Sequence, residues 1–396
     1  MLRVLTFPAR PASKVPPMDA SLRVPDLIAV FEDLPDPRID RTKHHRLIDI
    51  VTIALCAVLS GADSFVEIAT YGQAKEAWLR TFLALPHGIP SHDTFGRVFA
   101  ALDPAAVEHR FLQWVHTTLR PDADQVIAVD GKTLRRSHDR GQGREALHLI
   151  SAWATETGVA LGQVRVADHE NEIVALPALL DQVVVAGAVV TLDAMGCQRE
   201  VARTIVERKG AYVLALKGNQ PALHEAVTLL FAEERETPQP GTTLDRAELL
   251  EKGHGRLERR TCWATDDPAV ITYLDPDARW PGLRSLAMVL AERLVGSARS
   301  QETRYYLSSL PADALRLNQI VRTHWRIENE LHWVLDVVFA EDQSRVRRGY
   351  ADQNLALVRR IALSLLKRDV TTNAGMKTKR LRAACDDSYL LSLLGQ

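Results

Sequence analysis

Two acidic residues stand where a carboxylate could take part in chemistry. Asp130 and Asp193 each follow a short apolar run of buried-strand type, Val126–Val129 and Ala188–Leu192. Ligand sites in mixed α/β sheets gather at the ends of strands, so two acids placed in this way can converge. Turns also favour Asp, however, and a single acid after a strand is more often an ordinary turn residue.

A third acid, Glu328, lies in a segment that the sequence predicts to be a long helix. It is three or four residues away from Trp325, Leu331 and His332, which places it on the apolar stripe of that helix. A carboxylate that faces a protein core must be paired or bind a metal ion. An intrahelical pair with His324, four residues earlier, accounts for Glu328 equally well.

Taken together, the three acids offer only hard oxygen ligands, which suit Mg²⁺ or Mn²⁺ rather than zinc. Such a cluster can hold two cations about 4 Å apart, an arrangement that promotes phosphoryl transfer. The charge of the metal ions would also offset the repulsion among the carboxylates. The spacing of the acids along the chain is too irregular to form a specific motif.

Basic residues gather in short stretches, although the 49 Lys and Arg residues nearly balance the 50 Asp and Glu residues. One cluster alone is more often a solvated surface, but several clusters beside a candidate metal site are typical of phosphate contacts. The clusters are Arg38, Arg41, Lys43 and Arg46; Lys132, Arg135, Arg136, Arg140 and Arg144; Arg345, Arg347 and Arg348; and Lys377, Lys379, Arg380 and Arg382.

The elements that must position these side chains divide the chain into regions. Residues 1–20 contain four prolines and no apolar core of signal-peptide length, so we expect a disordered leader. Residues 21–120 have helical periodicity, with a capping box at Ser64 and Glu67, and we expect a separate all-α domain. Residues 371–396 are predicted to form a basic C-terminal tail.

Beyond residue 120 short apolar runs alternate with amphipathic segments, which predicts a mixed sheet flanked by helices. Residues from about 233 to 300 are rich in proline and glycine, and we interpret them as a β-rich insertion. Strands are expected at 125–130, 147–155, 159–166, 188–192, 211–217, 285–293 and 305–310, and late helices at 313–339 and 352–367.

Composition and cysteine spacing exclude several classes of protein. With 46% apolar and 25% charged residues, the chain is an ordinary globular protein. Its longest apolar stretches are about ten residues, well short of the ~20 that cross a bilayer, so no membrane association is expected. The four cysteines are far apart and form no Cys-x-x-Cys pair, which fits a reducing cytoplasm.

Several sequence blocks resemble one known family. Ala128-Val-Asp-Gly-Lys-Thr-Leu-Arg-Arg-Ser137, Thr191-Leu-Asp-Ala-Met-Gly-Cys-Gln198 and the segments 214–221, 254–259, 305–310 and 324–342 resemble the DDE transposases of bacterial insertion sequences. The resemblance is to the subgroup that includes the H-repeat-associated proteins. Segments 55–63 and 89–99 resemble the accessory domain of that subgroup, and the match covers about residues 25–370.

The resemblance implies an RNase H-like catalytic domain over residues 121–370, with a mixed five-stranded sheet. It also implies that Asp130, Asp193 and Glu328 are the catalytic, metal-binding acids, with two Mg²⁺ (or Mn²⁺) ions as cofactor. The expected activity is metal-dependent cleavage and strand transfer of double-stranded DNA at the terminal inverted repeats of an insertion sequence. A homodimer in the DNA complex and a cytoplasmic, nucleoid-associated location are expected with it.

DNA contacts are expected from the basic clusters and from the helix that carries Glu328. Related transposases carry a Tyr, an Arg and a Lys on the glutamate helix, where this chain has Val321, His324 and Leu335. The expected contacts near the acids are Lys132, Arg135, Arg136, Lys217, Arg322, His324, Arg326, Arg345, Arg347 and Arg348. Those expected in the N-terminal domain are Arg38, Arg41, Lys43 and Arg46.

Three alternatives remain open at this point. A domesticated RNase H-like nuclease would cut DNA without joining strands. An inactive relative would bind DNA without cutting it, although the presence of all three acids counts against decay of the site. A sugar-phosphate phosphatase could also use three acids, but the arginine clusters would then have no evident role.

Overall fold

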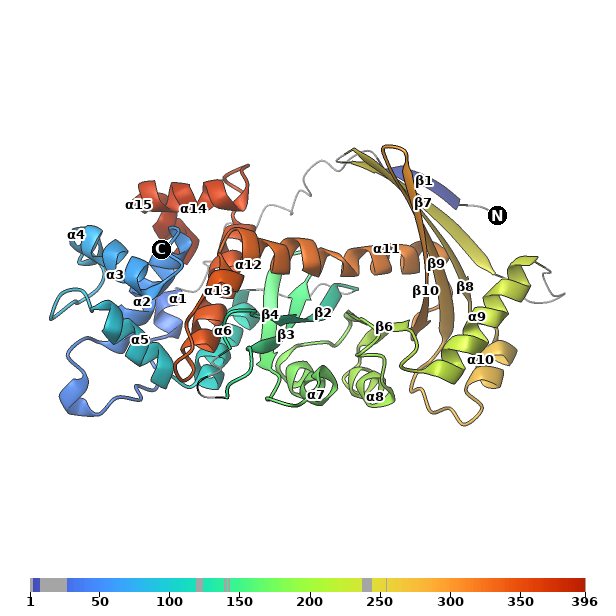
Figure 1. Ribbon diagram of the computed structural model, residues 1–396, viewed down its shortest axis with the longest axis horizontal. Coiled ribbons are helices and arrows are strands. Elements are labelled where there is room, and N and C mark those ends of the chain that lie inside the picture. Colours follow the sequence, from blue (N-terminus) through green and yellow to red (C-terminus); the bar gives the residue numbers. More distant parts are fainter. Residues whose placement is uncertain are drawn as a thin grey trace. The chain divides into compact units, whose positions relative to one another are not determined.

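The protein is described from a computed structural model that covers residues 3–7, 27–118, 124–138, 141, 143–236, 244–253 and 255–395. These residues form two compact units, coloured along the chain in Figure 1. The first consists of Met1–Pro16, Pro121–Asp130 and Glu172–Arg326, and the second of Pro17–Arg120, Gly131–Asn171 and Ile327–Gln396. The segment predicted as one catalytic domain, 121–370, therefore contributes to both units.

The first unit is built on a sheet whose strand order is β1-β7-β8-β9-β10-β6-β5-β2. Strands β2, β5 and β6 run parallel to one another, whereas β7 to β10 form an antiparallel meander of long, curved strands (Figure 1). The strands are β1 (Arg3–Phe7), β2 (Val126–Thr133), β5 (Val189–Leu192), β6 (Ala211–Leu216), β7 (Asp245–Gly253), β8 (Arg256–Thr265), β9 (Ser285–Val295) and β10 (Ala298–Ser308).

Helices cover this sheet with apolar faces. Helix α11 (Ala314–His324) packs on β7 and β8 and buries Leu317, Ile320 and Val321 in a core that includes the sheet residue Val213. This burial removes apolar surface from water and is the main force that holds the helix on the sheet. The remaining helices are α7 (Glu172–Gln182), α8 (Arg199–Glu207), α9 (Pro221–Glu236) and α10 (Pro268–Leu274).

The second unit is mainly helical and contains the hairpin β3 (His148–Ala154) and β4 (Val159–Arg165). Helix α2 (Leu47–Leu59) is buried along its whole length and packs against α13 (Ala351–Arg368). The other helices are α1 (Leu27–Val30), α3 (Phe65–Ala74), α4 (Glu76–Leu79), α5 (His92–Ala101), α6 (Pro104–Thr118), α12 (Trp333–Val337), α14 (Met376–Cys385) and α15 (Asp387–Leu394).

The predicted capping box at the start of α3 is confirmed. The backbone N–H of Glu67 donates to Ser64 Oγ at 3.3 Å, and the backbone N–H of Ser64 donates to Glu67 Oε2 at 3.0 Å. Two of the backbone donors that a helix start leaves unpaired are satisfied in this way.

The predicted five-stranded sheet is wrong in its number of strands, because the described strands form one sheet of ten, in which β3 and β4 follow β2. Residues 233–300 were predicted to be a β-rich insertion, and β7, β8 and β9 from this segment extend the sheet through β10 to β6. Among the described residues of the segment, its prolines and most of its glycines fall outside these strands, and Pro268 begins α10.

Both chain ends also differ from their predictions. Arg3–Phe7 form strand β1, which pairs in parallel with β7, so the predicted disordered leader is wrong there, while residues 1–2 and 8–20 lie outside the described residues. The predicted basic tail forms α14 and α15. Lys379 is buried and pairs with Asp369 at 3.3 Å, and Arg380 is buried and pairs with Asp63 at 2.9 Å.

The predicted continuous helix 313–339 is interrupted. Helix α11 ends at His324, and the π-helical segment Glu328–His332 precedes α12. The interruption begins at Trp325, the C-cap of α11, so the regular helical phase is lost before Glu328. Glu328 is exposed and not on the buried stripe, whereas Leu331 and His332 are buried. Within the described residues, no helix is long and apolar enough to cross a membrane.

Candidate metal and nucleic-acid site

Asp130 and Asp193 lie on neighbouring parallel strands of the first unit, Asp193 directly after β5 and Asp130 within β2, which continues to Thr133. In the register of β2 and β5, Val129 stands opposite Leu192, so the next residue of each strand is one of these acids. Neighbouring strands lie about 4.8 Å apart, which brings the two carboxylates side by side. Both acids are half-buried. The site thus has two oxygen-donor side chains where the pairing of β2 and β5 ends, Asp193 directly after β5 and Asp130 within β2.

The surroundings of Asp193 disfavour an isolated negative charge. Burial raises the pKa of Asp193, and the negative charge of Asp130 raises it as well. Backbone N–H groups of Met195 and Gly196 donate to Asp193 Oδ1 at 3.0 and 3.4 Å and act in the opposite direction. Two half-buried carboxylates that repel each other are stabilised by a divalent cation, so this pair fits Mg²⁺ or Mn²⁺.

The turn that follows Asp193 is held by residues that the sequence did not single out. Asn219 Nδ2 donates to the backbone oxygen of Ala194 at 2.5 Å, and Gln220 Nε2 donates to that of Cys197 at 3.1 Å. Both amides belong to the 214–221 block that resembles the transposase family, which was the available signal. They fix the backbone on which Asp193 stands.

Lys217 is exposed immediately after β6, the parallel neighbour of β5. It therefore stands at the same edge of the sheet as Asp193, where a cation can meet an anionic substrate. Among the described residues of the first unit, no other predicted DNA contact directly follows a strand at this edge.

His324 and Arg322 are engaged in contacts within the first unit. His324 Nδ1 lies 2.9 Å from Thr191 Oγ1, and Thr191 is two residues before Asp193 on β5. The histidine is thereby anchored close to the acid pair. Arg322 Nε donates to Glu251 Oε2 at 2.8 Å, and this carboxylate also pairs with Arg260. Arg322 thus forms an ion pair within the chain, whereas it was predicted to contact DNA. Arg326 is half-buried.

Glu328 belongs to the second unit and is exposed. Its neighbour Glu330 pairs with Lys367 at 3.1 Å. In the part of the chain that the structure describes, no group of three His, Cys, Asp or Glu side chains is close enough together to hold a metal ion. The assignment of Glu328 as the third ligand therefore rests on its sequence block.

Lys132 is not placed as a phosphate contact, which corrects the prediction. It is buried, its Nζ donates to Glu341 Oε2 at 2.8 Å, and it also pairs with Asp336. Burial alone would raise the pKa of Glu341, but the positive charges of Arg360 and Lys132 hold it at about 2. Arg360 Nη1 donates to Glu341 Oε1 at 3.0 Å. These residues form a buried ion network just beyond Asp130 along β2.

The other predicted DNA contacts of the second unit divide by exposure. Arg38 is largely buried and pairs with Asp36 at 2.7 Å within a local turn, so it does not present its charge to a partner. Arg347 is half-buried, and Lys43 pairs with Asp40 at 2.9 Å. The exposed members are Arg41, Lys43, Arg46, Arg135, Arg136, Arg345 and Arg348.

Comparisons with known proteins place the sequence among transposases. Residues 121–365 match the family described as "Transposase DDE domain", and residues 28–115 match the family described as "DDE_Tnp_1-associated". The H repeat-associated putative transposase YhhI of Escherichia coli K12 is 36% identical over 366 residues, which are 91% of this chain and 95% of that protein.

A second relative and a solved structure also match this chain. A protein of Xanthobacter autotrophicus described as an uncharacterized protein in the dhlA 3′ region is 46% identical over 296 residues, covering 74% of this chain and 98% of that protein. Among solved structures, a piggyBac transposase synaptic complex with hairpin DNA has a TM-score of 0.42 at 11% identity, covering 94% of this chain and 77% of that chain.

Proposed function

Since the chain belongs to the family of transposases with a DDE domain, we propose that it cuts and rejoins the DNA ends of an insertion sequence. It would bind the terminal inverted repeats of the element, hydrolyse a phosphodiester bond there and join the freed 3′ end to target DNA. The observation that carries this proposal is the register of β2 and β5, which puts Asp130 and Asp193 side by side.

Asp130, Asp193 and Glu328 are proposed as the ligands of two Mg²⁺ (or Mn²⁺) ions. When bound at such a site, these ions supply an activated nucleophile and stabilise the leaving oxygen of an in-line displacement. Within an RNase H-like core, β2 and β5 would provide the first two ligands, and Asn219 would keep the turn after Asp193 in place. His324, anchored on Thr191, would orient the substrate beside the acids.

Basic side chains would position the DNA backbone around the acids. Lys217 at the carboxyl edge of the sheet is the proposed contact in the first unit. Arg135, Arg136, Arg345 and Arg348 are the exposed candidates from the catalytic segments of the second unit, and Arg41, Lys43 and Arg46 are those of the N-terminal helices. Contacts of this kind fix orientation and affinity but carry no sequence information. A homodimer bound to DNA in the bacterial cytoplasm is part of the same proposal.

Cleavage of a supercoiled plasmid that carries both ends of the element tests the catalytic assignment. We expect nicked and linear products with Mg²⁺ and at least a hundredfold loss for Asp130→Asn, Asp193→Asn or Glu328→Gln. Glu330→Gln is the matched control, since it removes a carboxylate two residues from Glu328 and should retain activity. Unimpaired cleavage by the Asp130 or Asp193 variant would remove the basis for the proposal.

A second assay separates the transposase from a nuclease that cannot join strands. The substrate is a duplex with the 3′ ends already cut, mixed with a target plasmid. A transposase joins the labelled ends to the target by attack of the 3′-hydroxyl on a target phosphate. Cleavage without any joined product would assign a nuclease, and DNA binding without either reaction would assign an inactive relative.

A further inference from the structure

A hollow of about 460 Å³ opens in the second unit between the start of α3, helix α5 and the loop that precedes α13. Three arginines line it, Arg97 from α5 and Arg347 and Arg348 from the loop. Its size is within the range of about 300–1,000 Å³ that is usual for ligand sites. Asp130, Asp193 and Glu328 are not among its lining residues.

The charge of the hollow is positive. Against the three arginines it contains one carboxylate, that of Asp93, which lies 3.6 Å from the ring nitrogen of His92. Arg97 and Arg348 are exposed, so both guanidinium groups are available to an anion in solvent. Guanidinium groups bind phosphate with two parallel hydrogen bonds and are favoured wherever phosphate is recognised.

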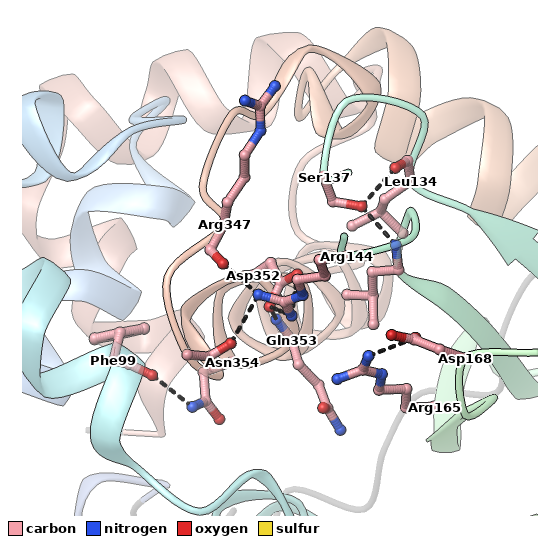
Figure 2. Close-up of polar contacts among 12 residues, drawn as sticks. Phe99, Leu134, Ser137, Arg144, Arg165, Asp168, Arg347, Asp352, Gln353 and Asn354 are labelled. Atoms are coloured by element: carbon pink, nitrogen blue, oxygen red, sulfur yellow. Dashed lines mark hydrogen bonds and ion pairs between the residues drawn. The ribbon is translucent and has the colours of Figure 1, made fainter. Parts of the chain in front are cut away.

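The loop that carries two of the arginines is fixed in place. Arg144 Nη1 donates to the backbone oxygens of Arg347 and Gly349, and Arg144 Nη2 donates to both carboxylate oxygens of Asp352 at 3.0 and 2.9 Å. Figure 2 shows this ion pair at the start of α13, with the side chain of Arg347 directed away from it. Arg347 Nε donates to the backbone oxygen of Arg136 at 3.1 Å.

The same loop is locked onto the end of α5. Gly349 has a φ of +52°, and a side chain there would come within 2.4 Å of the backbone oxygen of Ala100. Asn354 Nδ2 donates to the backbone oxygens of Phe99 and Leu102 at 2.8 and 2.9 Å, and the first of these bonds is drawn in Figure 2. The backbone that carries Arg348 is thus ordered before binding, which lowers the cost of ordering the loop on binding.

Apolar residues also line the hollow, among them Phe65, Val66 and Val346. Phe65 lies edge-on to the buried Phe99, with ring centroids 5.3 Å apart, and Gly96 leaves space beside it. The exposed Arg135 and Arg136 adjoin the loop through the hydrogen bond from Arg347. The positive surface therefore continues outside the hollow, as a long polyanion requires, instead of closing around a small anion.

We propose that this hollow binds backbone phosphates of the DNA substrate, with Arg97 and Arg348 as the contacting groups. The inference rests on the proposed function and extends it, because it assigns a DNA contact to α5 of the N-terminal helices. In this proposal Arg97 from α5 and Arg348 from the loop before α13 together form one phosphate site. The apolar lining residues can contact the deoxyribose that lies between successive phosphates.

The test measures binding of the full chain to a fluorescein-labelled duplex of mixed sequence, about 30 base pairs long, since phosphate contacts do not depend on sequence. We expect Arg97→Gln and Arg348→Gln each to weaken binding about threefold to tenfold at roughly 0.1 M salt. Each should also lower the slope of log Kd against log salt by about one. Gly96→Leu fills the hollow without changing charge and should weaken binding as well.

Arg80→Gln is the matched control, because Arg80 is an exposed, ion-paired arginine of the same unit outside the hollow. One outcome would overturn the inference and leave the proposed function standing. In it the wild-type chain binds the duplex, and Arg97→Gln and Arg348→Gln bind it no more weakly than Arg80→Gln does. No duplex binding by the wild-type chain would overturn both.

Inorganic phosphate is the second probe. The inference fails if phosphate raises the Tm of the wild-type chain and Arg97→Gln abolishes that rise while duplex affinity is unchanged. The hollow would then be a site for a small anion. If the Arg97→Gln and Arg348→Gln variants keep their folded circular dichroism spectrum and lose duplex affinity together, the inference is supported.

Discussion

Removal of the charge on Glu341 should destabilise the second unit strongly. Glu341 is buried and holds two buried cations, Lys132 at 2.8 Å and Arg360 at 3.0 Å. Their positive charges hold its pKa at about 2, against an ordinary value of 4.5. That difference corresponds to roughly 3 kcal/mol of stability at neutral pH. Glu341→Gln leaves both cations buried without this partner, and we expect a loss of about 3–5 kcal/mol.

Urea unfolding followed by circular dichroism measures the effect, with Asp342→Asn as control. Asp342 is 3.4 Å from Arg135, whose side chain is 83% exposed, so its replacement should cost less than about 1 kcal/mol. A Lys132→Met, Glu341→Met double variant should be less destabilised than Glu341→Gln, because it leaves fewer buried charges unpaired. A free energy of unfolding for Glu341→Gln within 1 kcal/mol of the Asp342→Asn value would refute the reasoning.

The pH dependence of the same measurement has a definite sign. The pKa of Glu341 is lower in the folded chain, so its contribution is fully present above about pH 4.5. It should disappear as the pH falls toward 2, and the difference between the wild-type chain and Glu341→Gln should narrow over that range. A difference that stays constant from pH 5 to pH 2 would contradict the assignment.

Three further predictions follow from local geometry. Gly349→Ala should lower the free energy of unfolding by about 2 kcal/mol or more, since φ is +52° and the new methyl group would meet the backbone oxygen of Ala100. A methyl group at Gly253 meets nothing within 4 Å, so Gly253→Ala should cost less than half as much in urea unfolding. Asn219→Ala should lower plasmid cleavage about tenfold with little change in duplex binding, because it loosens the turn after the second acid, and an unchanged rate would exclude this role. In the native chain at neutral pH a maleimide should label only the exposed Cys385, and mass spectrometry that finds more than one labelled thiol would contradict the burial of the other three. Burial raises the pKa of those three thiols, which are Cys56, Cys197 and Cys262.

Local signals predicted the parts of the fold that depend on local chemistry. The apolar run of β5 was sufficient to locate a buried strand with an acid directly after it. Ser64 and Glu67 predicted a helix start, because a capping box satisfies its own backbone donors without distant partners. The mixed sheet with flanking helices followed from the alternation of such elements.

Features that depend on distant partners were not predictable in this way. Lys132 has its partners Asp336 and Glu341 more than two hundred residues away, so its sequence neighbourhood indicated only an exposed basic cluster. The place of β7, β8 and β9 within the sheet depends on pairing through β10 to β6, which no local pattern specifies.

Glu328 shows a third limit. A regular period of 3.6 residues placed it on the buried face, but the helix is interrupted at Trp325 and Glu328 is exposed. For a metal ligand the exposed position is the more useful one, since a substrate can reach it.

The central claim is that Asp130 and Asp193 are direct metal ligands for DNA cleavage, and exchange of their oxygen for sulfur tests it most directly. Asp130→Cys and Asp193→Cys replace a hard ligand by a thiolate, which binds Mg²⁺ poorly and the softer Mn²⁺ better. The measurement is the rate of plasmid cleavage by each variant with Mg²⁺ and with Mn²⁺. We predict no detectable cleavage with Mg²⁺ and a partial return of cleavage with Mn²⁺, whereas Asp130→Ala and Asp193→Ala stay inactive with both. Equal cleavage by the Cys variants and the wild-type chain with Mg²⁺ would contradict the claim.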